Sequence, residues 1–109
     1  MENEIKYYPY SCIGELANAE TGRITQMLFC MMILEVNDDP NTISKYGKLS
    51  VAVQYKVKER ENYKRFFRER FYFDKGKEHY VLEITDEFVE FVIDRIKKVG
   101  EIYNVKFKQ

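Results

Sequence analysis

Apolar and polar side chains alternate most clearly between Lys48 and Lys58, where the pattern predicts a strand. One face of this strand is apolar and consists of Leu49, Val51, Val53, Tyr55 and Val57. The opposite face is polar or small and consists of Ser50, Ala52, Gln54, Lys56 and Lys58. One solvent-exposed face and one buried face are typical of an antiparallel sheet that packs on a core through a single side.

The aromatic and basic stretch Tyr63–Phe73 fits either a strand or a helical stripe. The turn residues 74–77 favour the strand, because Gly76 can supply the positive φ that a tight hairpin needs. Alternation resumes in residues 78–84. We therefore predict a hairpin in which at least residues 67–74 are strand.

The two faces of the predicted hairpin strand carry different side chains. One face is aromatic and is expected to feed the core through Phe67, Phe71 and Phe73, with Glu69 beside them. The other face is expected to meet solvent and carries Phe66, Arg68, Arg70 and Tyr72.

A C-terminal amphipathic helix is predicted over residues 86–99. Thr85 is a suitable N-cap, and two acidic residues follow it in the first turn, where the helix dipole favours them. Gly100 is a candidate for the residue that ends the helix. The apolar side chains at helical spacing are Phe88, Phe91, Val92, Ile96 and Val99.

The N-terminal part of the chain is predicted to form shorter secondary-structure elements. Ile5–Tyr10 has the pattern of an edge strand, since Pro9 lacks a backbone donor. Residues 11–22 form a turn-rich connector with room for one helical turn around Ile13. At the other end of the chain, the alternation of residues 103–107 predicts a last strand that returns to the sheet.

Residues 23–36 contain the apolar run MLFCMMIL, for which two structures remain open. A continuous apolar run is typical of a strand buried on both faces, and we take this as the prediction. The methionines have good helix propensity, so a buried helix is the alternative. Together these patterns predict one α+β domain of 109 residues, with an antiparallel sheet of about five strands and the C-terminal helix on its dry face.

The charge of the chain sums to zero but is unevenly distributed. Residues 1–44 carry a net −5, whereas residues 55–70 carry a net +4. A neutral chain differs from the strongly basic domains that bind duplex backbones, yet a local basic strip on a neutral body can still attract an anion. Aromatic residues are abundant, with nine Tyr and eight Phe.

These features predict a non-enzymatic protein that binds single-stranded nucleic acid through a basic and aromatic sheet face. If the two predicted basic strands pair, their cations lie side by side, where phosphates can meet them and bases can stack on the rings. The candidate binding residues are Lys56, Lys58, Lys64, Arg68, Arg70 and Tyr72. Acidic neighbours such as Glu69 could instead pair with these cations. We expect replacement of both Arg68 and Arg70 by alanine to leave stability nearly intact.

The alternative is a small protein-interaction module, such as an inhibitor, an immunity-like partner or an assembly subunit. Tyrosine and arginine are enriched at interface hot spots. The predicted edge strands and the apolar run also make a homodimer a possible state. Nucleic-acid binding should weaken steeply with salt, whereas an interface built on rings should tolerate it.

No catalytic, metal or cofactor site is predicted. His79 lacks a specific partner in the sequence and is expected to be a surface residue. The carboxylates Glu35, Asp38 and Asp39 lack calcium-loop spacing, so an acidic turn is the better interpretation. Asp38 or Asp39 before Gln54-Tyr55-Lys56 resembles a nuclease arrangement only weakly, because glutamine replaces a carboxylate.

The compartment is predicted from the cysteines and the N-terminus. Cys12 and Cys30 have neither metal-type nor redox-type spacing and are expected to be free and buried, which favours a reducing cytoplasm. No secretory signal pattern opens the chain, and the longest apolar run is too short to span a membrane. The composition, with few Gly and Pro, is similar to that of phage or plasmid accessory proteins.

Overall fold

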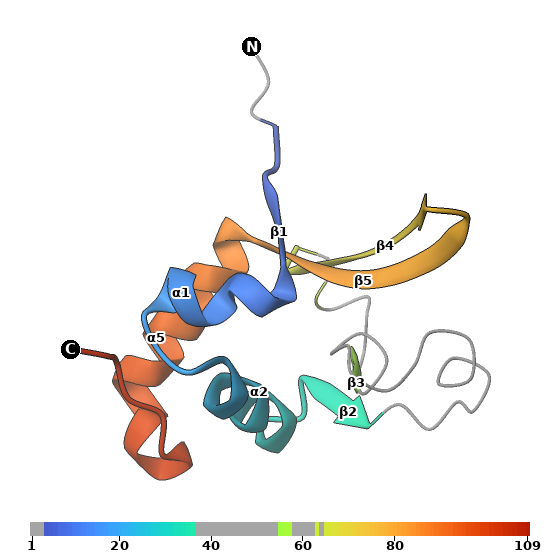
Figure 1. Ribbon diagram of the computed structural model, residues 1–109. Coiled ribbons are helices and arrows are strands. Elements are labelled where there is room, and N and C mark those ends of the chain that lie inside the picture. Colours follow the sequence, from blue (N-terminus) through green and yellow to red (C-terminus); the bar gives the residue numbers. More distant parts are fainter. Residues whose placement is uncertain (1–3, 37–54, 58–62, 64) are drawn as a thin grey trace.

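The computed structural model describes residues 4–36, 55–57, 63 and 65–109, which form three α-helices and two antiparallel sheets (Figure 1). The larger sheet has the order β1-β5-β4 and consists of β1 (Tyr7–Pro9), β5 (Lys77–Thr85) and β4 (Phe67–Asp74). The smaller sheet pairs β2 (Leu34–Val36) with β3 (Tyr55–Val57). The helices are α1 (Ile13–Ala17), α2 (Thr21–Cys30) and α5 (Asp86–Tyr103), and the short 3-10 turn η1 (Tyr10–Cys12) precedes α1.

This arrangement confirms the α+β class and corrects the predicted sheet. In the described part of the chain the strands form sheets of three and two strands, rather than one sheet of about five. β3 pairs with β2 and not with β4, so the condition under which the cations of the two basic strands would lie side by side is not met for residues 55–57. Most of the predicted strand 48–58 lies outside the described residues.

The predicted hairpin is present with the expected strand, Phe67–Asp74. β4 and β5 pair in the register that sets Asp74 opposite Lys77 and Phe67 opposite Ile84. Lys75 and Gly76 between them have φ of 54° and 74°. Two consecutive positive φ values are the signature of a type I′ turn, whose twist matches that of the flanking strands.

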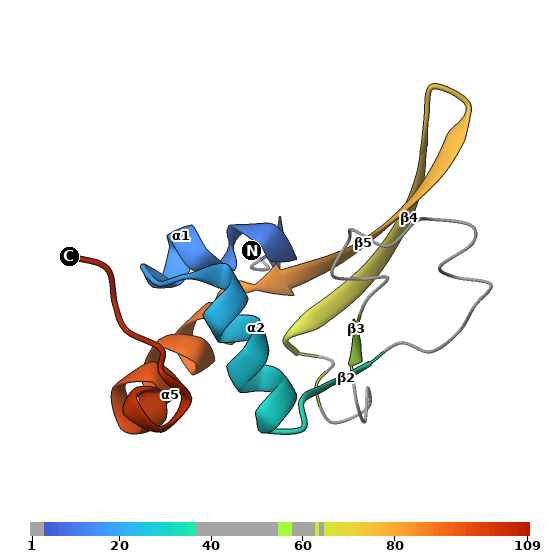
Figure 2. The same cartoon turned by 60° about the horizontal axis from the view of Figure 1, so that its bottom comes forward.

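The predicted core position of Phe71 and Phe73 is wrong. Both side chains lie on the face of Phe67, as the alternation predicted, but they are 54% and 74% exposed. The reason is the length of the hairpin: its turn end extends away from the helices in both ribbon views (Figures 1 and 2). Phe67 lies near the base of the hairpin and packs on Phe88, with ring centroids 4.6 Å apart.

Residues 21–30 are helical, so the preferred strand prediction for the apolar run is wrong. Ile24, Met27 and Leu28 are buried at the spacing of one helix face, and Phe29 and Cys30 lie on the exposed side. Only the end of the run, from Leu34, is extended. The run combines an amphipathic helix, a turn and a short strand, and this combination conceals the helical period.

Helix α5 starts as predicted but ends later. Its N-cap is Thr85, and its buried side includes the predicted Phe88, Val92 and Ile96. The helix continues past Gly100 to Tyr103, so the predicted end at Gly100 is wrong. A Cβ at position 100 would lie 2.6 Å from the Val105 carbonyl oxygen, so glycine is needed there for close backbone packing.

Each of the three described α-helices ends in the same kind of turn, with a left-handed residue one or two positions beyond the helix. These residues are Asn18 after α1, Met32 after α2 and Asn104 after α5, with φ of 57°, 64° and 57°. In each turn the next amide N–H bonds a carbonyl five residues back, as in Ala19 N to Gly14 O at 2.9 Å and Val105 N to Gly100 O at 2.8 Å. These contacts satisfy carbonyl groups that the helix end leaves open.

The C-terminal tail packs on the end of α1 and does not join the sheet, which corrects the predicted last strand. Ala19 and Phe107 form an isolated antiparallel bridge. Asn18 makes two hydrogen bonds to the backbone of Lys108. Its carbonyl accepts from the Lys108 amide at 2.7 Å, and its side-chain amide donates to the Lys108 carbonyl at 2.9 Å.

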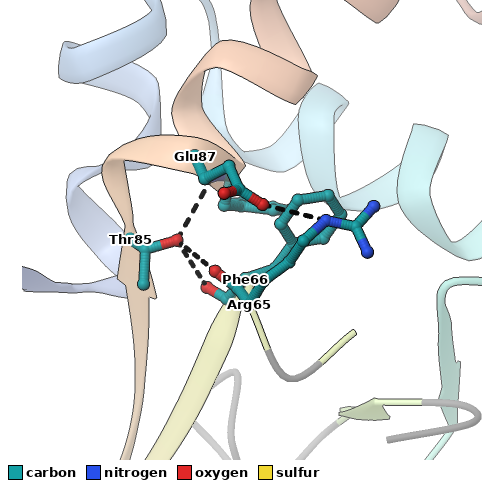
Figure 3. A network of polar contacts seen from close by, with 5 residues as sticks. Arg65, Phe66, Thr85 and Glu87 are labelled. Atoms are coloured by element: carbon teal, nitrogen blue, oxygen red, sulfur yellow. Dashed lines mark hydrogen bonds and ion pairs between the residues drawn. The ribbon is translucent and has the colours of Figure 1, made fainter. Parts of the chain in front are cut away.

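Thr85 joins the sheet to α5 without an intervening loop (Figure 3). Its hydroxyl donates to the Arg65 carbonyl at 2.7 Å and accepts from the Phe88 amide at 3.3 Å. Its own amide donates to the Phe66 carbonyl at 3.1 Å. Above this junction, Arg65 Nε lies 2.9 Å from Glu87 Oε2. One buried threonine therefore fixes the entrance to β4 and the start of α5 together.

We expect Thr85→Ala to lower the free energy of unfolding by about 2 kcal/mol, because it removes the cap and the donor to the Arg65 carbonyl. Thr85→Ser keeps the hydroxyl and should cost less than about 1 kcal/mol, since it loses one methyl group. Urea denaturation of both variants measures the difference. Equal stability of the two variants would show that the hydroxyl bonds contribute nothing.

Met32→Asn is expected to stabilise the protein by about 0.5–1 kcal/mol. Asparagine tolerates the left-handed region better than methionine, and it already stands at the two corresponding helix ends. Met32→Leu is the control, because it keeps an apolar side chain without easing the backbone. A urea midpoint that rises for Met32→Asn alone, at constant m, confirms the expectation.

Candidate nucleic-acid interface

The three-stranded sheet has one face turned away from the core, and rings and arginines line it. Strand register places Arg68 opposite Glu83, Tyr72 opposite His79 and Pro9 opposite Glu83. Side chains on this face therefore come from all three strands. We call the series Tyr7, Arg68, Arg70, Tyr72 and His79 the aromatic–arginine stripe.

A buried carboxylate lies at the centre of the stripe. The Glu83 side chain is only 8% exposed, and Arg68 donates to its Oε1 through Nε at 2.9 Å and Nη2 at 2.5 Å. Arg70 Nη1 lies 3.6 Å from the other oxygen, Oε2. Two guanidinium groups thus share one carboxylate, and this group of three retains one positive charge.

Rings extend the stripe on both sides of this charge cluster. The Arg68 guanidinium lies 3.7 Å from the centroid of the Tyr7 ring, within the range of a cation–π contact. The Arg70 guanidinium lies 5.2 Å from the Tyr72 ring. Tyr72 in turn stacks on His79, with centroids 5.1 Å apart and planes inclined by 18°. Planar groups therefore follow one another from β1 almost to the hairpin turn.

The structure brings together half of the predicted binding residues. Arg68, Arg70 and Tyr72 lie on one face, as expected. Lys58 and Lys64 lie outside the described residues. Lys56 belongs to β3, opposite Glu35 of β2, and is therefore in the other sheet.

Phe66, predicted for the wet face, is instead a core residue. Its side chain is 2% exposed and packs on Phe91, with ring centroids 4.9 Å apart. Phe66 precedes the first residue of β4, so the alternation of that strand does not apply to it.

Sequence reasoning missed three residues of this site: Tyr7, Glu83 and His79. Glu83 could have been found from the turn, because pairing Asp74 with Lys77 sets Arg68 opposite Glu83. His79 follows from the same count as the partner of Tyr72. Tyr7 could not be found this way, since β1 is far from the hairpin in the chain and its register depends on the folded sheet.

Other candidate chemistry is sparse in the described residues. No group of three or more His, Cys, Asp or Glu side chains there is placed to hold a metal ion. Both cysteines are free, as predicted, but neither is buried: Cys12 is half-buried and Cys30 is exposed. Among the described helices, none is long and apolar enough to cross a membrane.

The buried Glu83 changes the expected effect of removing the arginines. Replacing both Arg68 and Arg70 would leave a buried carboxylate without these two partners, so the sequence-based expectation of nearly intact stability no longer holds.

We expect Arg68→Ala to cost about 1–3 kcal/mol, because it removes both hydrogen bonds to Glu83. Arg70→Ala should cost less than about 1 kcal/mol, since its ion pair is longer and Arg70 is half exposed. Chemical denaturation of the two single variants measures this difference. If Arg70→Ala costs as much as Arg68→Ala, the described hydrogen bonds do not hold Glu83.

Comparison with known proteins found no match: no family model fits the chain, and neither a curated protein nor a solved structure is significantly similar to it.

Proposed function

We propose that this protein binds single-stranded nucleic acid through the aromatic–arginine stripe. The observation that carries the proposal is the alternation of guanidinium groups and rings on one face of the three-stranded sheet. Bases stack on such rings whatever their sequence, and arginines contact the phosphates between them.

The arginines keep donors for a ligand while they hold Glu83. A guanidinium group has five N–H donors, and Arg68 uses two of its nitrogens on Glu83. The side chains of Arg68 and Arg70 remain 45% and 54% exposed. Glu83 thus orients the two groups, and their outer N–H donors are available to phosphate oxygens.

The same geometry limits the electrostatic contribution to the affinity for nucleic acid. With one carboxylate between two guanidinium groups, the stripe offers two phosphate contacts and a single excess charge. Two contacts to a single strand correspond to a slope of about −1.4 for log K against log salt. Stacking should therefore supply much of the affinity, and binding should be moderate and without marked sequence preference.

The test is a fluorescence-anisotropy titration of a labelled mixed-sequence single-stranded oligonucleotide, at low salt and near physiological salt. We expect Arg70→Ala/Tyr72→Ala to weaken binding at least about tenfold, through one lost stacking contact and one lost cation. Arg68 stays in place in this variant so that Glu83 keeps its hydrogen bonds.

A matched control removes one cation and one exposed apolar side chain elsewhere. Lys97→Ala/Ile102→Ala does so on α5, where both positions are exposed. This control should bind like the unaltered protein. Absence of binding by the unaltered protein at low salt, or equal loss in the two double variants, contradicts the proposal.

A protein-interaction module is the second candidate, supported by the exposed rings of Phe71 and Phe73 on the projecting hairpin. Exposed apolar groups of this kind commonly mark interaction surfaces. For either function we propose a reducing, cytoplasmic setting, which the two free cysteines support.

A further inference from the structure

A pocket lies between the first turn of α2 and the C-terminal tail, on residues that the proposed function does not use. Its volume is about 340 Å³, and we call it the tail pocket. Six residues line it: Glu20, Arg23, Asn104, Lys106, Phe107 and Lys108. The two segments are distant in the sequence and meet because the tail packs on the end of α1 (Figures 1 and 2). Pockets for small molecules measure about 300–1,000 Å³, so the tail pocket suits one small ligand.

Backbone contacts hold the tail that forms one wall of the pocket. The Val105 amide donates to the Gly100 carbonyl at 2.8 Å, and the Val105 side chain is buried. The backbone of Lys108 makes its two hydrogen bonds to Asn18. The charged ends of Lys106 and Lys108 therefore have no part in holding the tail in place. The wall is formed before a ligand arrives, which lowers the free-energy cost of ordering it on binding.

Three cations meet at the tail pocket, and one carboxylate faces them. Arg23 is one of only two basic residues within residues 1–44, and its ion pair with Glu20 is long, at 3.9 Å from Nε to Oε2. Within the described part of the chain, neither Lys106 nor Lys108 forms an ion pair. Glu20 is the only carboxylate in the lining, so the pocket carries a net charge of +2.

The lining favours an anion that carries an aromatic ring. A concave surface of one sign concentrates ions of the opposite sign, and a phosphate monoester has a charge of about −1.5 to −2 at pH 7, which matches the pocket. Phe107 lies between the two lysines in the sequence and is 37% exposed, so its ring offers a surface on which a base can stack. Asn104 adds a carboxamide that can both donate and accept hydrogen bonds. A nucleotide has all the groups that this lining can bind.

We propose that the tail pocket binds one nucleotide, with its phosphate monoester among Arg23, Lys106 and Lys108. The base then stacks on Phe107. A free mononucleotide and the 5′-phosphorylated end of a strand share this chemistry. The tail pocket has no residue in common with the aromatic–arginine stripe, so this inference does not rest on the proposed function and the two surfaces can be altered separately.

The first test is isothermal titration calorimetry of the full chain at low salt with adenosine 5′-monophosphate, adenosine and inorganic phosphate. We expect the monophosphate to bind at least about tenfold more tightly than either other compound, because adenosine lacks the phosphate and inorganic phosphate lacks the base. Equal affinities for the monophosphate and inorganic phosphate would overturn the nucleotide as the ligand. Absence of binding at millimolar monophosphate would overturn the site itself.

The second test places the ligand with variants. Lys106→Ala/Lys108→Ala should weaken monophosphate binding about tenfold or more, because two of the three cations are lost. Lys77→Ala/Lys97→Ala is the matched control, since it removes two exposed lysines outside the pocket and should bind normally. Phe107→Leu keeps an apolar side chain and should weaken binding of the monophosphate while leaving inorganic phosphate unchanged. Equal losses in the two double variants would show general charge attraction and overturn the pocket.

Further titrations separate the two sources of the nucleotide. An oligonucleotide that gains affinity from a 5′-phosphate, and loses this gain in Lys106→Ala/Lys108→Ala, assigns the pocket to the end of a strand. Equal binding with and without the phosphate assigns it to the free mononucleotide.

The same variants separate the tail pocket from the proposed function. Arg70→Ala/Tyr72→Ala alters the stripe alone and should bind the monophosphate normally. Loss of monophosphate binding in this variant, with binding retained in Lys106→Ala/Lys108→Ala, would place the nucleotide on the stripe and overturn the pocket. Failure of the proposed function shows instead as absent binding of the unphosphorylated oligonucleotide by the unaltered protein.

Discussion

The direct junction of β5 with α5 at Thr85 is the constraint on which the rest of the fold depends. Because no loop separates strand from helix, the hydroxyl of one buried residue sets the direction in which α5 leaves the sheet. The same hydroxyl holds the chain just before β4 through the Arg65 carbonyl. The two hairpin strands are therefore fixed to the helix at one end only. Phe67 and Ile84 reach the core there, and the turn end extends past it.

The candidate site follows from that geometry. Glu83 stands two residues before the junction, where the sheet is anchored, so its carboxylate is buried and needs Arg68. Tyr72 and His79 stand farther along the same face, where the hairpin has left the core. The stripe thus begins at a fixed ion pair and ends on stacked rings in the projecting arm. A buried carboxylate that orients arginines costs free energy of desolvation, which the hydrogen bonds to Arg68 offset.

Local signals in the sequence predicted those elements whose ends carry specific chemistry. The hairpin was predicted from Gly76, and the start of α5 from Thr85, because each depends on its immediate neighbours. Periodicity correctly gave the shared face of Phe67, Phe71 and Phe73, but it carries no information on how far the core extends along a strand. Helix α2 was only the alternative to a strand in the prediction, because its apolar residues continue without a break into the next turn and strand.

One further signal was present and was missed. The segments Gly14-Glu15-Leu16-Ala17-Asn18-Ala19 and Gly100-Glu101-Ile102-Tyr103-Asn104-Val105 share the pattern Gly-Glu-aliphatic-x-Asn-aliphatic. Both end a helix with a left-handed asparagine, and in both a Cβ on the glycine would collide with backbone or side chain. Recognition of this pattern in the sequence would have placed the predicted end of α5 at Tyr103, where the structure has it, rather than at Gly100.

Alternation along β4 assigns its two faces to different roles. Even-numbered residues 68, 70 and 72 build the stripe, whereas odd-numbered residues 71 and 73 turn their rings to the opposite face. A change at Arg70 or Tyr72 therefore acts on the proposed binding surface, and a change at Phe73 acts on the opposite face. The rings of Phe71 and Phe73 stay exposed, although they share the face of Phe67 that packs on Phe88, because the hairpin is longer than the core that supports its base.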